Sequence, residues 1–269
     1  GLSKNFSIIL TLVFLFALAL VLIFFKSTPN LDSTTKIDNT NNSSLVGSAI
    51  PYLNPRSYLS FASPAIGNTS SKIFIIEIGD FQCPYCKTFY DQELPLIRLN
   101  YLNTGLASFV YVNSPFPSIH DKAVDASLAG FCANEQNSFY QMHNLLFDRQ
   151  DAWNRTPKEV FVNTLLSYAD ELKLNQIQFK TCLESKKYSA ELDAQVNASS
   201  SLGVSGTPTF FILIQKDKIQ DFKSKFEQIR LNSVSGFALT PYQNEKEYVI
   251  VISGFVDYKT FKAVLDISN

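Results

Sequence analysis

Two cysteines, Cys83 and Cys86, have the type and spacing that most directly indicate chemistry in this chain of 269 residues. Two residues separate them, and Pro84 follows the first. At the start of a helix, sulfurs at i and i+3 can bond to each other, and the first faces unpaired backbone N–H groups and the positive end of the helix dipole. This setting stabilises the thiolate, which is the attacking species in disulfide exchange. The motif therefore predicts Cys83 as the outer nucleophile and Cys86 as its resolving partner.

A metal site and a static cross-link are the competing interpretations of this motif. A structural zinc site usually brings a second C-x-x-C or a closely spaced histidine pair. Here the two other cysteines are 50 positions apart and the two histidines 23 apart. A static bond within the motif closes too small a loop to add much stability. Disulfide exchange is favoured, and we expect no metal and no other cofactor.

Short apolar runs rich in β-branched residues predict the strands that hold the motif. Cys83 follows the first run after a short turn. Pro84 fits the first position of a helix, where its missing N–H is harmless and its fixed φ helps. The expected strands are 73–78, 107–112, 209–214 and 248–252.

About 80 residues of helical pattern separate the second and third expected strands. Residues 156–159 indicate a capping box with proline at the first helical position, and Asn175 with Gln178 opens another short helix. An amphipathic helix is expected at 258–267. The predicted order is β-α-β, a helical block, and β-β-α.

About 32 residues, 215–246, separate the last two expected strands, where a hairpin loop of a few residues is usual. Phe222, Phe226 and Ile229 are spaced i, i+4, i+7, so part of this insertion is predicted to be helical. It either covers an edge strand or contacts a partner.

The N-terminal residues have a composition that differs from the rest of the chain. Residues 6–25 are apolar and uncharged, long enough to span a bilayer. A cleaved signal peptide is the alternative, but the Ala17-Leu18-Ala19 run lies inside the apolar segment, which favours an uncleaved anchor. Thirteen of residues 27–48 are Ser, Thr or Asn, which indicates a flexible linker.

Net charge and composition limit the class of partner. The formal net charge is −1 and no block of Lys and Arg stands out, which disfavours nucleic acid. With 46% hydrophobic residues, the chain can form one domain with a sizeable core and attached segments.

Four segments together carry a family resemblance. They are EIGDFQCPYCKTFY, FCANEQNSFYQMHNLLFD, FKTCLESKKYSAEL and LGVSGTPTFFIL. In this order and spacing they resemble the DsbA-like thiol–disulfide oxidoreductases, and most of all their membrane-anchored BdbD-type branch. The resemblance covers about 63–214, with a weaker tail from Gly254. CPYC alone also occurs in glutaredoxins, so the specific signal is its combination with GTPTFF and the helical block.

The resemblance implies an α/β thioredoxin fold with a helical domain inserted between its second and third strands. We then expect a transmembrane anchor at 1–26, a linker at 27–62, a first thioredoxin-like part at 63–115, the inserted helical domain at 116–202, and a second thioredoxin-like part at 203–269 that includes the insertion 215–246.

The resemblance also assigns roles to residues around the dithiol. It implies that Pro208 is a cis-proline facing the disulfide, with the Thr207 backbone presented to an extended substrate. Pro84 and Tyr85 complete the expected substrate contacts. Tyr85 stands where the best-known DsbA proteins have histidine, which leaves oxidase or reductase direction open.

Glu77 matches the buried acid beneath the active site of this superfamily. The alternative is an ordinary carboxylate in solvent at a strand end. His120 falls where relatives often have a histidine at a helix start, and a structural role is favoured over catalysis. His143 lies on an apolar stripe and is expected to serve packing.

Cys132 and Cys182 are not explained by the active site. They are either buried free thiols or, in an oxidising compartment, a structural disulfide. Some relatives also have cysteines in the matching segments, and we predict the disulfide.

The function implied is introduction of disulfides into reduced or unfolded exported proteins by a membrane-tethered enzyme with an extracytoplasmic catalytic domain. A DsbB- or VKOR-like membrane protein would reoxidise it. Two alternatives remain: a reductase or isomerase of the same fold, and a non-catalytic peptide-binding or chaperone module.

Overall fold

The computed structural model describes residues 63–216, 221–232, 239–243 and 247–268. The chain divides into two units, 1–45 and 46–269, and every described residue lies in the second. The expected anchor at 1–26 and linker at 27–62 lie outside the described residues. Of the helices that are described, none is long and apolar enough to cross a membrane.

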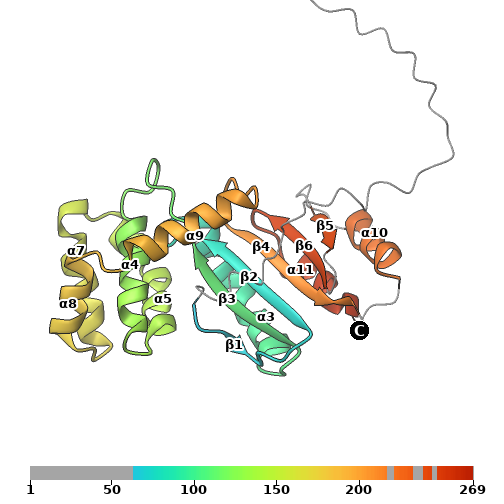
Figure 1. Ribbon diagram of the computed structural model, residues 1–269, viewed down its shortest axis with the longest axis horizontal. Coiled ribbons are helices and arrows are strands. Elements are labelled where there is room, and N and C mark those ends of the chain that lie inside the picture. The colour runs from blue at the N-terminus through green and yellow to red at the C-terminus, as the bar shows by residue number, and fades with distance from the viewer. Residues whose placement is uncertain (1–62, 217–220, 233–238, 244–246, 269) are drawn as a thin grey trace, which may run out of the picture. The chain divides into compact units, whose positions relative to one another are not determined.

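A six-stranded sheet with the order β1-β3-β2-β4-β6-β5 forms the centre of the described part (Figure 1). β2 and β3 are parallel, and the other neighbouring strands are antiparallel. The strands are β1 (Ile66–Gly67), β2 (Ile73–Gly79), β3 (Ala107–Asn113), β4 (Thr209–Gln215), β5 (Leu239–Gln243) and β6 (Glu247–Ser253). All four expected strands are confirmed, each within one residue at either end. β2 and β3 are buried at every position, as their apolar runs indicated.

The insertion at 215–246 contributes β5, a strand that the sequence analysis did not predict. β5 pairs with β6 at the edge of the sheet. Its central Pro241 has no N–H to donate, which an edge strand tolerates. Of the two roles considered for this insertion, the structure therefore supports covering an edge strand.

Helices cover both faces of the sheet. One face packs against the helical segment after the dithiol, which consists of α2 (Pro84–Thr88), η2 (Phe89–Glu93), α3 (Leu94–Ile97) and η3 (Arg98–Leu102). The same face holds α11 (Tyr258–Leu265), its extension η5 (Asp266–Ser268) and α10 (Phe222–Asn232). Phe222 and Phe226 of α10 are buried, which confirms the helix predicted from their spacing. The opposite face packs against Ala198 and Leu202 near the end of α9.

The helical block lies between β3 and β4, as predicted. It consists of α4 (Ala123–Asn134), α5 (Phe139–Asp148), α6 (Gln150–Asn154), α7 (Lys158–Glu171), α8 (Gln176–Glu184) and α9 (Ser189–Ser201). Figure 1 shows α4, α5, α7 and α8 gathered beside the sheet, while α9 returns along it.

One local prediction in this block is wrong. Pro157, not Thr156, directly precedes the first residue of α7, and no side chain caps this end. The Thr156 hydroxyl instead donates to Trp153 O at 2.7 Å, so the end of α6 uses the group that the capping box required. The prediction for α8 is confirmed, because the Asn175 side chain accepts from Gln178 N.

Candidate active site

The turn between β2 and α2 places Cys83 at the start of a helix. Cys83 directly precedes the helix with extended backbone (φ −72°, ψ 125°), and Pro84 is the first helical residue. The Cys83 N–H donates to Asp80 O at 3.0 Å and closes the turn. Cys86 lies within the helix, on its buried side. The helix start expected from the sequence is therefore present.

The two sulfurs have opposite electrostatic surroundings. Both residues are thiols in this structure. A hydrogen bond with the Cys86 thiol is the largest of the causes that lower the pKa of the Cys83 thiol to about 6. Hydrogen bonds with Thr207 and with backbone groups of the helix start also lower it, while burial opposes them. Burial, followed by the influence of Cys83, raises the pKa of Cys86 well above its usual value. These surroundings therefore favour the thiolate form of Cys83 and the thiol form of Cys86.

The segment that leads into β4 forms the opposite wall of the site. The Thr207–Pro208 peptide bond is cis. The Cys83 Sγ lies 3.3 Å from Thr207 O, so the chain brings together positions that are 124 residues apart. Thr207 is half-buried and Pro208 buried. On the outer side, Pro84 is exposed and Tyr85 is 61% exposed.

Glu77 lies beneath the dithiol on β2. It is 1% exposed, and among the described residues its Oε1 has no hydrogen-bond partner. Burial, with the nearby Cys83 as a second cause, raises the pKa of this carboxyl well above its usual value. Glu77 is therefore not the solvated strand-end carboxylate of the alternative interpretation.

Asp80 organises the loop before Cys83. It is completely buried. One of its carboxylate oxygens accepts from Gln82 N at 2.7 Å, and the other accepts from Phe116 N at 2.9 Å. His120 Nδ1 lies 2.8 Å from that second oxygen, and this hydrogen bond is the main reason that the pKa of His120 is raised. His120 thus pairs with the active-site loop from the turn before α4.

Gln150 is a residue of the site that the sequence analysis missed. Its buried Nε2 donates to Phe81 O at 2.7 Å and to Cys83 O at 3.0 Å. Asn154 on the same helix accepts from Gln82 Nε2 at 2.8 Å. The helical block therefore holds the active-site turn through side-chain amides. No local pattern marks Gln150, because Cys83 lies 67 positions away in the sequence.

His143 serves packing, as predicted. It is 1% exposed, and burial lowers the pKa of its imidazole to about 4. Aromatic rings surround it, including Phe81 at 5.6 Å and Tyr111 at 5.0 Å between ring centroids.

Cys132 and Cys182 form a disulfide with an S–S distance of 2.00 Å. It joins α4 to α8, and both residues are buried. The bond closes a loop across 50 positions within the helical block. This pair therefore lies apart from the dithiol, which belongs to the turn between β2 and α2.

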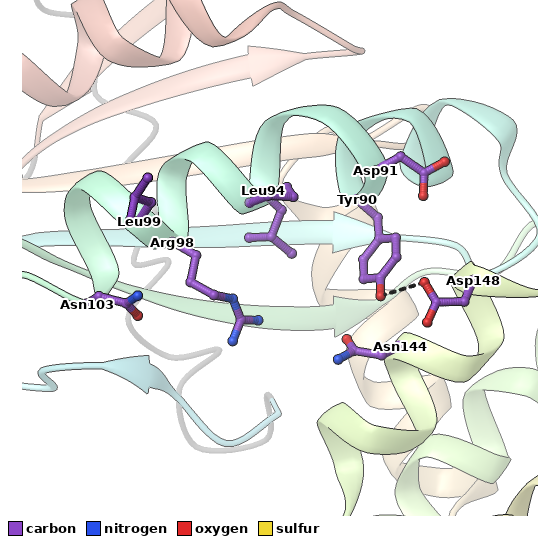
Figure 2. Close-up of a pocket in the computed structure, with 9 residues that line it drawn as sticks. Tyr90, Asp91, Leu94, Arg98, Leu99, Asn103, Asn144 and Asp148 are labelled. Atoms are coloured by element: carbon purple, nitrogen blue, oxygen red, sulfur yellow. Dashed lines mark hydrogen bonds between the residues drawn. The ribbon is translucent and has the colours of Figure 1, made fainter.

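A cavity of about 530 Å³ lies between the helical segment after the dithiol and α5 (Figure 2). Tyr90, Arg98 and Asn144 are among its lining residues, and the Tyr90 hydroxyl donates to Asp148 Oδ1 at 2.9 Å. Neither cysteine of the motif lines it. We therefore place the candidate active site by the sulfur chemistry and not by this cavity.

The fold and this site together agree with the class that the sequence resembles, the DsbA-like thiol–disulfide oxidoreductases, and the family comparison confirms the resemblance. The chain belongs to the thioredoxin family, whose model matches residues 60–230. The crystal structure of oxidised BdbD from Bacillus subtilis is similar, with a TM-score of 0.58 and 20% identity over 78% of this chain and 94% of that one. At this identity the similarity shows the fold alone.

Two curated relatives match over parts of their length. A Rickettsia typhi protein with a provisional name as a protein-disulfide oxidoreductase is 28% identical over 149 residues, 55% of this chain and 53% of that protein. The Na(+)/H(+) antiporter NhaA 3 of Salinispora tropica is 32% identical over 146 residues, 54% of this chain and 21% of the antiporter. The chain thus spans about half of the first and a fifth of the second, so neither protein's whole activity is carried over.

Proposed function

We propose that this protein introduces disulfides into other proteins by exchange through Cys83 and Cys86. A substrate thiolate attacks Cys83 Sγ of the oxidised pair, the bond to Cys86 breaks, and a mixed disulfide forms on Cys83. A second substrate thiolate then attacks the substrate sulfur, which releases a substrate disulfide and leaves both enzyme cysteines reduced.

The asymmetry of the two thiols carries this proposal. A Cys83 thiol with a pKa of about 6 is mostly thiolate at neutral pH, and a thiolate is a good leaving group. Stabilising the thiolate stabilises the reduced form, which makes the disulfide form a stronger oxidant. The proposed direction is therefore oxidation of the substrate and not reduction.

The surroundings of Cys83 suit an extended substrate. Thr207, with Pro208 and the start of β4, offers backbone groups beside the sulfur for strand-like pairing, and exposed Pro84 and Tyr85 lie on the other side. Glu77, beneath the pair, would exchange a proton with Cys86.

The proposed location is outside the cytoplasm, with the apolar segment 6–25 as membrane anchor. The Cys132–Cys182 disulfide supports this location, because such bonds persist in oxidising compartments. Reduced exported proteins are then the proposed substrates, and a DsbB- or VKOR-like membrane protein the proposed reoxidant. Residues 63–115 and 203–269 are proposed as the two parts of the thioredoxin-like catalytic domain. Residues 116–202 are proposed as the inserted helical domain.

The test is oxidative refolding of a reduced, unfolded protein that contains two cysteines, with the oxidised chain as the only oxidant. We expect one substrate disulfide per active site and complete loss of this activity in Cys83→Ser. The matched control, Cys132→Ser/Cys182→Ser, should retain it. A reduction potential of about −270 mV instead of about −120 mV would indicate a reductase. Peptide binding or folding assistance that survives Cys83→Ser, with no disulfide transfer by the wild type, would indicate a non-catalytic peptide-binding or chaperone module.

A further inference from the structure

Two buried polar groups beneath the dithiol have no partner within the described part of the chain. They are Glu77 Oε1 and the hydroxyl of Tyr111, which is itself 0% exposed. Leaving a buried polar group unpaired costs about 1–3 kcal/mol, so such groups call for an explanation. Tyr111 has no role in the chemistry described so far.

Strand register places the two residues that carry these groups side by side in the sheet. Glu77 on β2 is directly opposite Tyr111 on the parallel strand β3, and such strands lie about 4.8 Å apart (Figure 1). Side chains alternate along a strand, and the alternate positions Ile75 and Phe109 belong to the same core cluster as Cys86. Glu77 and Tyr111 therefore face the helix that holds the dithiol.

Gly79 lets the Tyr111 hydroxyl lie near the active-site turn. A Cβ on Gly79 would lie 2.4 Å from Tyr111 Cε2 and 2.8 Å from its hydroxyl oxygen, so only glycine leaves room for this ring. Gly79 ends β2, four positions before Cys83. The phenol thus extends from the position opposite Glu77 toward the turn that holds the reactive sulfur.

The groups around Tyr111 are those that exchange protons in the reaction. Burial and then Cys86 are the largest causes that raise the pKa of Tyr111, followed by Glu77, Asp80 and Cys83. His143 packs edge-on against the ring, and its lowered pKa keeps it neutral. Tyr111 therefore remains a phenol, able to accept one proton while it donates another.

We propose that the Tyr111 hydroxyl relays a proton between the Glu77 carboxyl and Cys86 Sγ. The inference rests on the proposed function. When a substrate thiolate attacks Cys83 and the S–S bond breaks, Cys86 leaves as a buried thiolate. The Tyr111 hydroxyl is hydrogen-bonded directly to neither group, so a bridging water at each end would carry the hydroxyl proton of Tyr111 to Cys86 and the Glu77 proton to Tyr111. Glu77 is left as a carboxylate, which solvent reprotonates.

The test is Tyr111→Phe, measured by stopped-flow reaction of the oxidised protein with a cysteine-containing peptide. General acid catalysis contributes about 10²–10⁴-fold, and we expect a loss of about tenfold or more, since a slower direct route remains. The rate per peptide thiolate should fall in the wild type as pH rises through the Glu77 pKa, and this fall should disappear in the variant. A purely structural hydroxyl would leave both the rate and its pH profile unchanged, and that result would overturn the relay.

Stability supplies an independent readout. Removing an unpaired buried hydroxyl should leave the free energy of unfolding unchanged or higher. The matched control is Tyr101→Phe, which removes a hydroxyl that donates to Asp266 Oδ1 at 2.7 Å. This control should lower stability and keep wild-type exchange kinetics. Slow exchange in both variants would refute the specific role of Tyr111.

The double variant Glu77→Gln/Tyr111→Phe tests whether the two groups act in one route. A shared route predicts a slowing no greater than that of the slower single variant, whereas multiplied effects would contradict it. The same assay with Cys83→Ser separates the two proposals. If Cys83→Ser abolishes exchange and Tyr111→Phe does not slow it, only the relay is wrong. If Cys83→Ser retains exchange, the proposed function fails as well.

Discussion

The two cysteine pairs of this protein are equally buried, yet their structural settings are opposite. Cys83 and Cys86 are 4% and 0% exposed, and Cys132 and Cys182 are 1% and 4% exposed. Exposure therefore does not separate a reactive pair from a structural one. The two pairs differ in their position relative to the helices. Cys83 directly precedes α2, whereas Cys132 and Cys182 lie in the last turns of α4 and α8.

The helix termini explain this difference. At the start of a helix, unpaired N–H groups and the dipole favour a thiolate, and near the end of a helix the dipole disfavours it. The first pair also faces the chain at Thr207, while the second lies within the packed helical block. A reactive thiol thus needs a polarised backbone more than it needs a large exposed surface.

The largest expected effect is the loss of exchange on removing the sulfur of Cys83. Cys83→Ser should reduce disulfide transfer to the level of buffer, since Cys86 is buried and its raised pKa keeps it a thiol. Cys86→Ser is the informative companion, because its Cys83 thiolate can still attack a peptide disulfide, releasing one peptide thiolate, and the mixed disulfide should accumulate and be visible by mass spectrometry. Equal amounts of mixed disulfide on Cys83→Ser and Cys86→Ser would contradict the distinction between outer and inner thiol.

Removing the other pair should affect stability and not exchange. Cys132→Ala/Cys182→Ala opens a loop across 50 positions, for which chain entropy gives about 4 kcal/mol as an upper figure. Urea unfolding measures this loss, and alkylation of Cys83 in the folded variant should match the wild type. A changed Cys83 reactivity at unchanged fold would show that the two pairs are coupled.

The pH dependence should distinguish the thiols of the reduced protein. Alkylation of Cys83 by iodoacetamide should have a midpoint near pH 6, against the usual thiol value of 9.0. At pH 7.5 this difference corresponds to about thirtyfold more thiolate. Mapping by mass spectrometry should find Cys86 unmodified over the same range, and a midpoint near 9 for Cys83 would contradict the assignment.

The same shift predicts how the stability of the reduced protein depends on pH. Below pH 6 Cys83 is a thiol in both the folded and the unfolded chain, so it contributes nothing. Between pH 6 and pH 9, Cys83 has lost its proton in the folded chain but keeps it in the unfolded chain. The contribution of Cys83 to stability therefore rises with pH over this range. Comparing urea unfolding of reduced wild type and Cys83→Ser isolates this contribution. No rise relative to Cys83→Ser would show that the thiolate is not stabilised by the fold.

The smallest expected effect is that of the amide that holds the active-site turn. Gln150→Leu leaves the carbonyls of Phe81 and Cys83 without this donor, at a cost of about 1–3 kcal/mol. The Cys83 pKa should also move upward, because the helix start is held less firmly. The matched control is Gln178→Leu, whose amide donates to Glu135 on the surface. Equal effects of the two substitutions on stability and on the Cys83 pKa would show that Gln150 does not hold the active-site turn.

Sequence patterns correctly predicted the elements that depend on interactions between residues close together in the chain. The buried strands, the proline at the start of α2 and the asparagine cap of α8 follow from residues close in sequence. The capping box at 156–159 failed because α6 ends there and takes the Thr156 hydroxyl. β5 was missed because its identity as a strand depends on pairing with β6 and not on its own composition.

The sequence by itself determined which residues could do chemistry: the C-x-x-C motif, its helix start and, through family resemblance, the buried acid and the proline before β4. Only the tertiary structure decided what surrounds them. Thr207 reaches Cys83 across 124 positions and Gln150 across 67, and Tyr111 faces Glu77 through strand register. The physical reason is that hydrogen bonds, burial and the resulting pKa shifts depend on distances in space, which side-chain patterns along the chain do not specify.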